Sequence, residues 1–388
     1  MNLAKRISII RTEVFLLLAL TMFSCVKQFE PNLDASVTNK IVISGQLLDV
    51  EGYQKIDISV SSPINNPKRN PLEHCDVRLY DNNGKVWQYT EVSDGEYGLW
   101  LKSNELDLSK EYHIEVLTPD NQRIVSTPES FYSCPEVDIL QFEKETHYNV
   151  VTKKEFPGLQ FFINLKAKEN DSRYYLYQVV ETSEYHTKHP IEWWYDGSVH
   201  HEVPPDKSKS LCWRTKMIDD IFVLSTAHLS NNEYTKNRLN FTDNQSQRLQ
   251  HLYSLLIKQL SLSKEAYIYW NQMRINQNQT GALYNNQPFP IKGNLVNVSN
   301  PDQRVLGYFM CSQIKEHRFF ISPQGIDIID NTCGKPVELR WGLQEIDPAQ
   351  YPAYLDGNAF HYFNSLFDTR CVDCRAAGGT TVKPVFWP

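Results

Sequence analysis

The sequence of 388 residues lacks any apolar run long enough for a transmembrane helix, which takes about 20 residues. Its N-terminal apolar run extends from Val14 to Phe23, about ten residues, and is interrupted by Thr21. That length is typical of the core of a signal peptide. We therefore expect a targeting segment at the N-terminus and no spanning helix.

Recognisable catalytic motifs are also absent. The chain has no G-x-S-x-G nucleophile elbow, no glycine-rich phosphate loop and no H-E-x-x-H zinc motif. Scattered aspartates and glutamates could furnish a glycosidase pair, but no spacing selects two of them. We expect a protein that is not an enzyme and has no cofactor. A hydrolase with a cryptic carboxylate pair remains the less favoured alternative.

Positive charge is scarce, with 39 lysines and arginines against 46 acidic residues and a net charge of −7. Nucleic-acid binding needs a basic surface, so we expect no nucleic-acid partner. Hydrophobic residues make up 41% of the chain and aromatic residues 12%, which predicts a packed core rather than disorder. The aromatic and β-branched content favours strands, so the expected class is mainly β.

The N-terminal segment predicts a lipid anchor. Lys5, Arg6 and Arg11 precede the apolar run, and Met22-Phe23-Ser24-Cys25 follows the pattern of a loose bacterial lipobox. A secretory cleavage site prefers small residues where Met22 and Phe23 stand. We expect residues 1–24 to be a lipoprotein signal peptide and Cys25 to carry the lipid that holds the protein on a membrane. Residues 25–39 would be the lipidated tether. The alternative is a secreted protein in which Cys25 falls there by chance.

Residues 40–132 are expected to form a β-sandwich of the transthyretin or immunoglobulin type. Ile56, Ile58 and Val60 alternate with polar residues, the period of a half-buried strand. Asn83-Gly84 separates two strand-like runs, a strong hairpin signal. Asp94-Gly95 marks another turn. Short strands at regular spacing are typical of a small antiparallel sandwich.

Residues 133–388 are expected to form a larger β-rich domain with a short helical insertion. Leu252 to Leu262 predicts a buried strand, and Ser263 looks like the N-cap of a helix over about 263–277. Gly293 to Val298 and Val305 to Ile321 predict a long hairpin, whereas residues 183–210 predict a long polar loop. A cysteine-containing tail ends the chain.

Seven of the eight cysteines remain after Cys25 is assigned to lipid, so at least one thiol is left unpaired. An exported protein is expected to form disulfides. Cys371-Val372-Asp373-Cys374 predicts a structural staple, within the pair or to Cys212, Cys311 or Cys333. Redox and metal-binding alternatives for this motif stay open. Cys75 and Cys134 flank the predicted sandwich, where they either pair or are unrelated buried thiols.

Trp193-Trp194-Tyr195 is the strongest candidate for contact with a ligand or partner, because exposed aromatic rings are enriched at interfaces. Sugar stacking and protein docking both fit, and the alternative is that the rings are core. Histidines and carboxylates that suit transition metals lie in the same region, but no spacing is diagnostic, and we expect no metal. They are His186, His189, His200, His201, Glu184, Glu192 and Glu202.

Taken together, several stretches resemble the domain-of-unknown-function family 4249 of Bacteroidota lipoproteins over nearly the whole chain. They are Ile43-Ser44-Gly45, Asp94 to Tyr97, Leu211-Cys212-Trp213, Leu262 to Trp270, Gly293-Asn294, Val305 to Phe309, and the tail with Cys371 to Arg375, Gly378-Gly379 and Pro384 to Trp387.

The resemblance implies an outer-membrane lipoprotein that is often encoded beside a TonB-dependent receptor, and it supplies no catalytic residues. We therefore expect a lipid-anchored accessory or ligand-binding protein of the outer membrane, on either face. It would work with a TonB-dependent receptor in nutrient uptake, on a small-molecule or glycan ligand. A structural or adhesive surface lipoprotein is the alternative.

Overall fold

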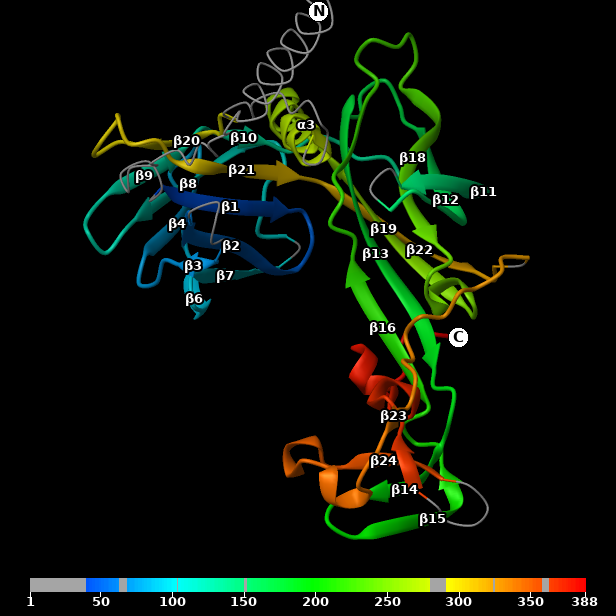
Figure 1. The fold of residues 1–388 in the computed structure, drawn as a ribbon. Helices are drawn as coiled ribbons and strands as arrows, with labels where there is room; N and C mark the ends of the chain where they lie inside the picture. The colour runs from blue at the N-terminus through cyan, green and yellow to red at the C-terminus, as the bar shows by residue number, and fades with distance from the viewer. Residues whose placement is uncertain are drawn as a thin grey trace, which may run out of the picture.

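The computed structural model describes residues 40–62, 68–102, 104–149, 152–279, 291–323, 325–357 and 363–388. The predicted signal peptide, Cys25 and the tether lie outside these residues. The molecule consists of a β-sandwich, a central module of two sheets, and a small distal lobe (Figure 1). The prediction of a mainly β protein is confirmed. Among the described residues, none of the helices combines the length and the apolar content that crossing a bilayer requires.

Two sheets form the sandwich, and local sequence patterns explain most of their strands. As predicted, Asn83-Gly84 closes the hairpin between β4 (Asp76–Asp81) and β5 (Val86–Gln88). Asp94-Gly95 closes the one between β6 (Thr90–Ser93) and β7 (Glu96–Leu101). The first sheet runs β21 (Leu306–Ser312), β1 (Ile41–Leu48), β2 (Gly52–Val60), β7 (Glu96–Leu101) and β6 (Thr90–Ser93), with β3 (Asn70–Pro71) beside β2. The second runs β20 (Leu295–Asn297), β9 (Arg123–Ser126), β8 (Glu111–Leu117), β4 (Asp76–Asp81) and β5 (Val86–Gln88), with β10 (Glu129–Ser130) beside β8.

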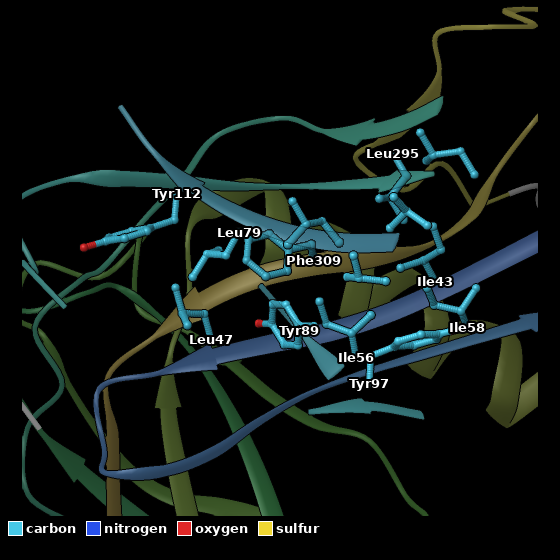
Figure 2. Packing of buried hydrophobic residues seen from close by; sticks show 14 of the residues in the cluster. Ile43, Leu47, Ile56, Ile58, Leu79, Tyr89, Tyr97, Tyr112, Leu295 and Phe309 are labelled. Atoms are coloured by element: carbon cyan, nitrogen blue, oxygen red, sulfur yellow. The ribbon is translucent and has the colours of Figure 1, made fainter. Parts of the chain in front are cut away.

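The core of the sandwich lies between these sheets. Alternate residues of each strand point inward, and Figure 2 shows Ile43, Ile56 and Ile58 of one sheet facing Leu79 of the other. Phe309 of β21 and Leu295 of β20 pack in the same cluster and are buried. Two strands from far along the chain therefore belong to this core.

The contribution of β20 and β21 corrects two predictions. The sandwich is not confined to residues 40–132, because β21 pairs in parallel with β1 and β20 pairs with β9. The predicted hairpin of residues 293–298 with residues 305–321 is wrong as well. Residues 305–321 form β21, which lies in the sandwich, and β22 (Ile314–Ile321), which lies in the central module. Alternating hydrophobicity identifies such strands but not their partners.

The central module packs two antiparallel sheets face to face. Leu159, Phe161 and Ile163 of one sheet bury against Tyr175, Tyr177 and Ile257 of the other. The three-stranded sheet is β11 (Leu140–Asn149), β12 (Lys154–Lys166) and β18 (Glu233–Asp243). The other is β16 (Leu211–Met217), β13 (Tyr174–His186), β19 (Tyr253–Ser261) and β22, with β17 (Phe222–Ser225) beside β13.

Helix α3 (Lys264–Gln279) joins the sandwich to the central module. Ser263 caps it, because its Oγ accepts a hydrogen bond from the amide of Ala266 at 3.1 Å. Ala266 is buried with Tyr308 and Met310 of β21 and with Leu260 of β19. The predicted helix is confirmed, and its position fixes the two parts against each other.

The distal lobe, defined here as residues 187–210, 333–357 and 363–388, has a small sheet of its own. The order is β15 (Val199–Asp206), β14 (Ile191–Tyr195), β24 (Ala353–Gly357), β25 (Phe363–Leu366) and β23 (Val337–Glu338). Short 3-10 turns follow its strands: η2 (Leu343–Glu345), η3 (Pro348–Gln350), η4 (Thr369–Cys371) and η5 (Cys374–Ala377). The prediction of a polar loop over 183–210 is wrong, since β13 runs on to His186 and β14 and β15 form a hairpin.

Candidate functional site

The predicted aromatic contact residues occupy β14 at the centre of the distal lobe. Successive residues of a strand face opposite sides of the sheet, so Trp193 and Trp194 lie on different faces. Trp194 and Tyr195 pair with Tyr354 and Ala353 of β24, which comes more than 150 residues later. All three predicted side chains are half-buried. They are neither fully exposed nor fully in the core.

Each tryptophan stacks on a histidine directly across the hairpin. The rings of Trp193 and His201 are 3.6 Å apart at 4°, and those of Trp194 and His200 are 3.8 Å apart at 9°. The indole Nε1 of Trp194 also donates to Glu202 at 2.9 Å. These cross-strand contacts hold the aromatic rings in fixed orientations. Three of the side chains that the sequence considered as metal ligands therefore contact indole groups here, namely His200, His201 and Glu202.

Two disulfides pin the C-terminal tail to the rest of the molecule. Cys374 bonds to Cys212 of β16, and Cys371 bonds to Cys333. The two cysteines of the C-x-x-C motif therefore reach different partners rather than each other. The motif therefore has the predicted structural role. Its partners are Cys212 and Cys333, two of the three cysteines that the sequence proposed outside the motif.

The remaining described cysteines, Cys75, Cys134 and Cys311, are free thiols. The structure therefore does not contain the pair between Cys75 and Cys134 that the sequence left open. Cys311 lies in β21 within the sandwich core, and Cys134 is buried beside Gln259. Both thiols fill buried space as small apolar residues do, which is how free cysteines commonly behave in proteins.

Asp373, inside the C-x-x-C motif, organises the tail. Its carboxylate caps η5 by accepting from the amide of Arg375 at 3.0 Å, and it pairs with the Arg375 guanidinium at 2.6 Å. Tyr354 of β24 donates to the same carboxylate at 3.5 Å. Burial opposes ionisation of Asp373, but Arg375 outweighs it and lowers the pKa. Burial raises the pKa of Tyr354 to about 12, so its hydroxyl stays a donor at neutral pH.

Two cavities flank Tyr354 in the distal lobe. The first, of about 410 Å³, lies beside β14 and has Trp193, His189 and Phe367 among its aromatic lining, with Glu192 and Asp356 as its carboxylates. The His189 and Phe367 rings stack at 4.5 Å. We call this cavity the Trp193 cleft.

The second cavity, of about 590 Å³, is lined by Tyr351, Asp368 and Arg375 among others. Flat apolar walls beside hydrogen-bonding groups are the general makeup of a small-molecule site. Both cavities therefore offer that combination, and the Trp193 cleft contains the predicted residue.

A third cavity, of about 370 Å³, lies where the central module meets the tail. Charged side chains line it, among them Glu184, Arg214 and Arg248. Among its lining residues, Arg248 lies 3.4 Å from Glu181, which also accepts a 2.6 Å hydrogen bond from Tyr253. Gly379 of the tail completes the wall beside Cys212.

The histidines that the sequence grouped together are divided by the structure. His189, His200 and His201 lie in the distal lobe, whereas His186 ends β13 in the central module. There His186 meets His251, which sequence reasoning missed. Burial and the neighbouring His186 lower the pKa of His251, while Glu184 acts in the opposite sense. The available signal was the alternation of Glu184 and His186 on one strand, but the pairing with β19 was not evident from it.

Comparison with known proteins gives one extensive match. A family model described as "Domain of unknown function (DUF4249)" matches residues 26–318. No curated protein matches the chain. Among solved structures, trypsin-activated alpha-2-macroglobulin from Escherichia coli is 12% identical, with 61% of this chain and 15% of that chain covered and a TM-score of 0.20. The chain thus spans about 15% of that protein's length, and a similarity this low transfers no property.

Proposed function

Because the family match covers more than half of the sequence, this chain belongs to the DUF4249 family, and we propose that it is a lipid-anchored binding protein of the outer membrane. In this proposal the lipid on Cys25 holds the sandwich near the bilayer. The distal lobe binds a small polar ligand with a flat apolar face, such as a sugar. A TonB-dependent receptor then takes up that ligand.

The arrangement of the three parts supports the division of roles. The described chain enters the sandwich at Lys40 and β1, only 15 residues after Cys25. The distal lobe lies beyond the central module, away from the sandwich (Figure 1). A lipid on Cys25 would therefore anchor the sandwich end and leave the lobe free to meet a ligand. Two acyl chains give a stable anchor, whereas one is marginal.

Lipidation of Cys25 is tested by metabolic labelling with a fatty acid. We expect the wild-type protein to incorporate label and Cys25→Ser to incorporate none, because the thiol is the acceptor. Cys75→Ser is the matched control, since Cys75 is a half-buried thiol of the sandwich. Equal labelling of wild type and Cys25→Ser, or none of either, contradicts the anchor.

The observation that carries the binding role is the Trp193 cleft. Trp193 is held flat by His201 at 3.6 Å, and Glu192 and Asp356 line the same cavity. A fixed aromatic face receives the apolar face of a sugar ring, and carboxylates accept hydrogen bonds from its hydroxyl groups. Because the indole ring is already fixed in orientation, a ligand that stacks on it loses little binding free energy to ordering of the site.

A glycan and small-metabolite screen on the full protein tests the binding role. We expect a hit whose affinity falls at least about tenfold, or 1.4 kcal/mol, in Trp193→Ala. Trp100→Ala is the control, because Trp100 is exposed on the sandwich. A hit that both variants weaken equally, or that neither weakens, contradicts binding at the Trp193 cleft.

Cooperation with a receptor is tested separately by mild crosslinking in cells. We expect a TonB-dependent barrel to copurify with the protein and deletion of the protein to reduce uptake of the ligand found in the screen. Recovery of abundant porins alone, with unchanged uptake, would favour a structural or adhesive surface protein instead. The support for a receptor partner is the family resemblance, which is an association rather than a mechanism.

A further inference from the structure

One carboxylate and two imidazoles meet where β13 leaves the central module for the distal lobe. Glu184 and His186 are two residues apart on β13, so their side chains leave the same face of the sheet. His251 lies just before β19, and β19 pairs with β13 through Tyr253 and Ser183. One ligand atom of each of the three side chains lies within 4.8 Å of the other two.

His186 carries an unsatisfied polar atom at this place. Its Nε2 is buried and has no hydrogen-bond partner, although buried polar atoms are normally paired. The ring of His186 stacks on that of His251 with centroids 3.8 Å apart. Stacking contributes ring contact but gives Nε2 no hydrogen-bond partner, and Nε2 offers a lone pair in the tautomer that carries its proton on Nδ1. A bound cation would satisfy this atom.

Gln247 holds the backbone of His186, and a cavity lies beside the cluster. The side-chain oxygen of Gln247 accepts from the amide of His186 at 3.0 Å, and the Gln247 nitrogen donates to the His186 carbonyl at 2.9 Å. Glu184 lines the cavity of about 370 Å³ between central module and tail. Because Glu184 and Gln247 both line that cavity, it can admit water or a further ligand at the Glu184 side of the cluster. An open coordination position of this kind is typical of zinc sites that also bind water or substrate.

The donor set selects the class of ion. Imidazole nitrogens suit zinc, copper, nickel and iron, whereas calcium and magnesium require mostly oxygen ligands. We propose that Glu184, His186 and His251 bind one divalent transition-metal ion, of which Zn²⁺ is the representative. Donor atoms at about 2.1 Å from zinc stand roughly 3.4 Å apart. Binding therefore turns at least one imidazole out of the stack so that the lone pairs converge.

The proposal is tested on the full protein, purified in detergent without a polyhistidine tag. Zn²⁺ is titrated calorimetrically, and Co²⁺ is titrated by visible absorption, which reports coordination geometry. We expect one ion per chain, with Co²⁺ absorption typical of four or five ligands and no binding of Mg²⁺ at the same concentration. His186→Ala and His251→Ala should each weaken Zn²⁺ binding at least tenfold. Glu184→Gln preserves shape and should weaken it as well.

His228→Ala is the matched control, because His228 is exposed in a turn outside the cluster. Circular dichroism checks the fold of each variant. If an alanine variant fails to fold, the Zn²⁺ affinity of Glu184→Gln decides the test. No stoichiometric binding of Zn²⁺ or Co²⁺, or equal weakening in His228→Ala, means that the two histidines only stack on each other and overturns the site. The test is independent of the sugar and receptor experiments, since neither involves these residues.

Discussion

Glu129 is a carboxylate held out of water where β10 of the sandwich meets helix α3 and β21. It is 5% exposed and accepts hydrogen bonds from Tyr308 at 2.6 Å and from Ser263 at 3.0 Å. Asn294 of the loop before β20 donates to it at 3.4 Å. One side chain thus links the sandwich, the cap of α3 and both late strands. Burial raises its pKa above the ordinary value of 4.5.

The raised pKa predicts a pH dependence that Glu129→Gln removes. The folded state holds the Glu129 proton more tightly than the unfolded chain does, so that contribution to stability is complete below about pH 4.5 and is lost as pH rises through the folded pKa. The free energy of unfolding of Glu129→Gln, minus that of wild type, should therefore increase with pH above 4.5. Urea titrations at several pH values measure it. A difference that stays constant or decreases contradicts the burial argument.

Gly307 allows β21 to approach β1. Its φ is +99°, and a Cβ there would lie 1.9 Å from the carbonyl oxygen of Ile43. Gly307→Ala should therefore combine backbone strain with a clash inside the β1–β21 ladder. Gly84, with φ +83° and nothing within 4 Å of its Cβ position, isolates the strain alone.

We expect Gly84→Ala to lower the free energy of unfolding by about 1–2 kcal/mol, the cost of left-handed backbone for alanine. Gly307→Ala should cost at least ~2 kcal/mol more, in the range of severe core defects. Chemical denaturation of both variants provides the comparison. Equal losses of unfolding free energy in the two variants would show that the β1–β21 ladder accommodates an alanine at Gly307.

At the scale of elements, the hairpin of β14 and β15 shows what the sequence predicted and what it did not. Trp193 to Tyr195 were singled out as candidate contact residues, a prediction that stays open, and the segment was wrongly interpreted as a loop. The histidines and prolines around it hide the alternation, and its partner β24 lies far along the chain. By contrast, the hairpins at Gly84 and Gly95 and the cap at Ser263 depend on neighbouring residues alone. Local patterns therefore predicted elements well, while distant pairings could not be inferred.

The same difference between local patterns and distant pairings explains how much of the candidate site could be predicted. A single sequence contains the residue types of the Trp193 cleft, but Asp356 and Phe367 join Trp193 only through the pairing of β14 with β24. The partners of Cys371 and Cys374 were left open for the same reason. His251 was missed because it reaches Glu184 only through the register of β13 and β19.

The stacked pairs of the hairpin predict a measurable coupling. Trp194 and His200 stack directly at 3.8 Å, so a double-mutant cycle of Trp194→Ala and His200→Ala should give about 0.5–1.5 kcal/mol of interaction energy. Hydrogen exchange of β14 and β15 amides measures it locally. Trp194→Ala combined with His201→Ala is the control, because His201 stacks on Trp193. Coupling of the same size in the control pair contradicts the contribution of stacking.

At the scale of the whole molecule, the disulfide between Cys212 and Cys374 joins residues 162 positions apart. It holds the tail on β16, where Thr380 bridges to Trp213. Further along the tail, the buried Trp387 packs on Phe320 of β22. Cys374→Ser should lower the free energy of unfolding by about 2–5 kcal/mol and expose Trp387 to quenchers of fluorescence.

Guanidinium denaturation and acrylamide quenching test this prediction. Cys75→Ser serves as the control, because Cys75 forms no disulfide. Unchanged stability and quenching in Cys374→Ser would mean that noncovalent contacts alone hold the tail.

The parallel pairing of β1 with β21 also determines when this protein can finish folding. Leu48 pairs with Ser312, so the outer edge of β1 has no partner until roughly 260 further residues have been made. At about 5–20 residues per second that interval lasts on the order of tens of seconds. An exposed strand edge pairs readily with other chains. The incomplete chain is therefore prone to aggregation at β1 until β21 is available to cover that edge.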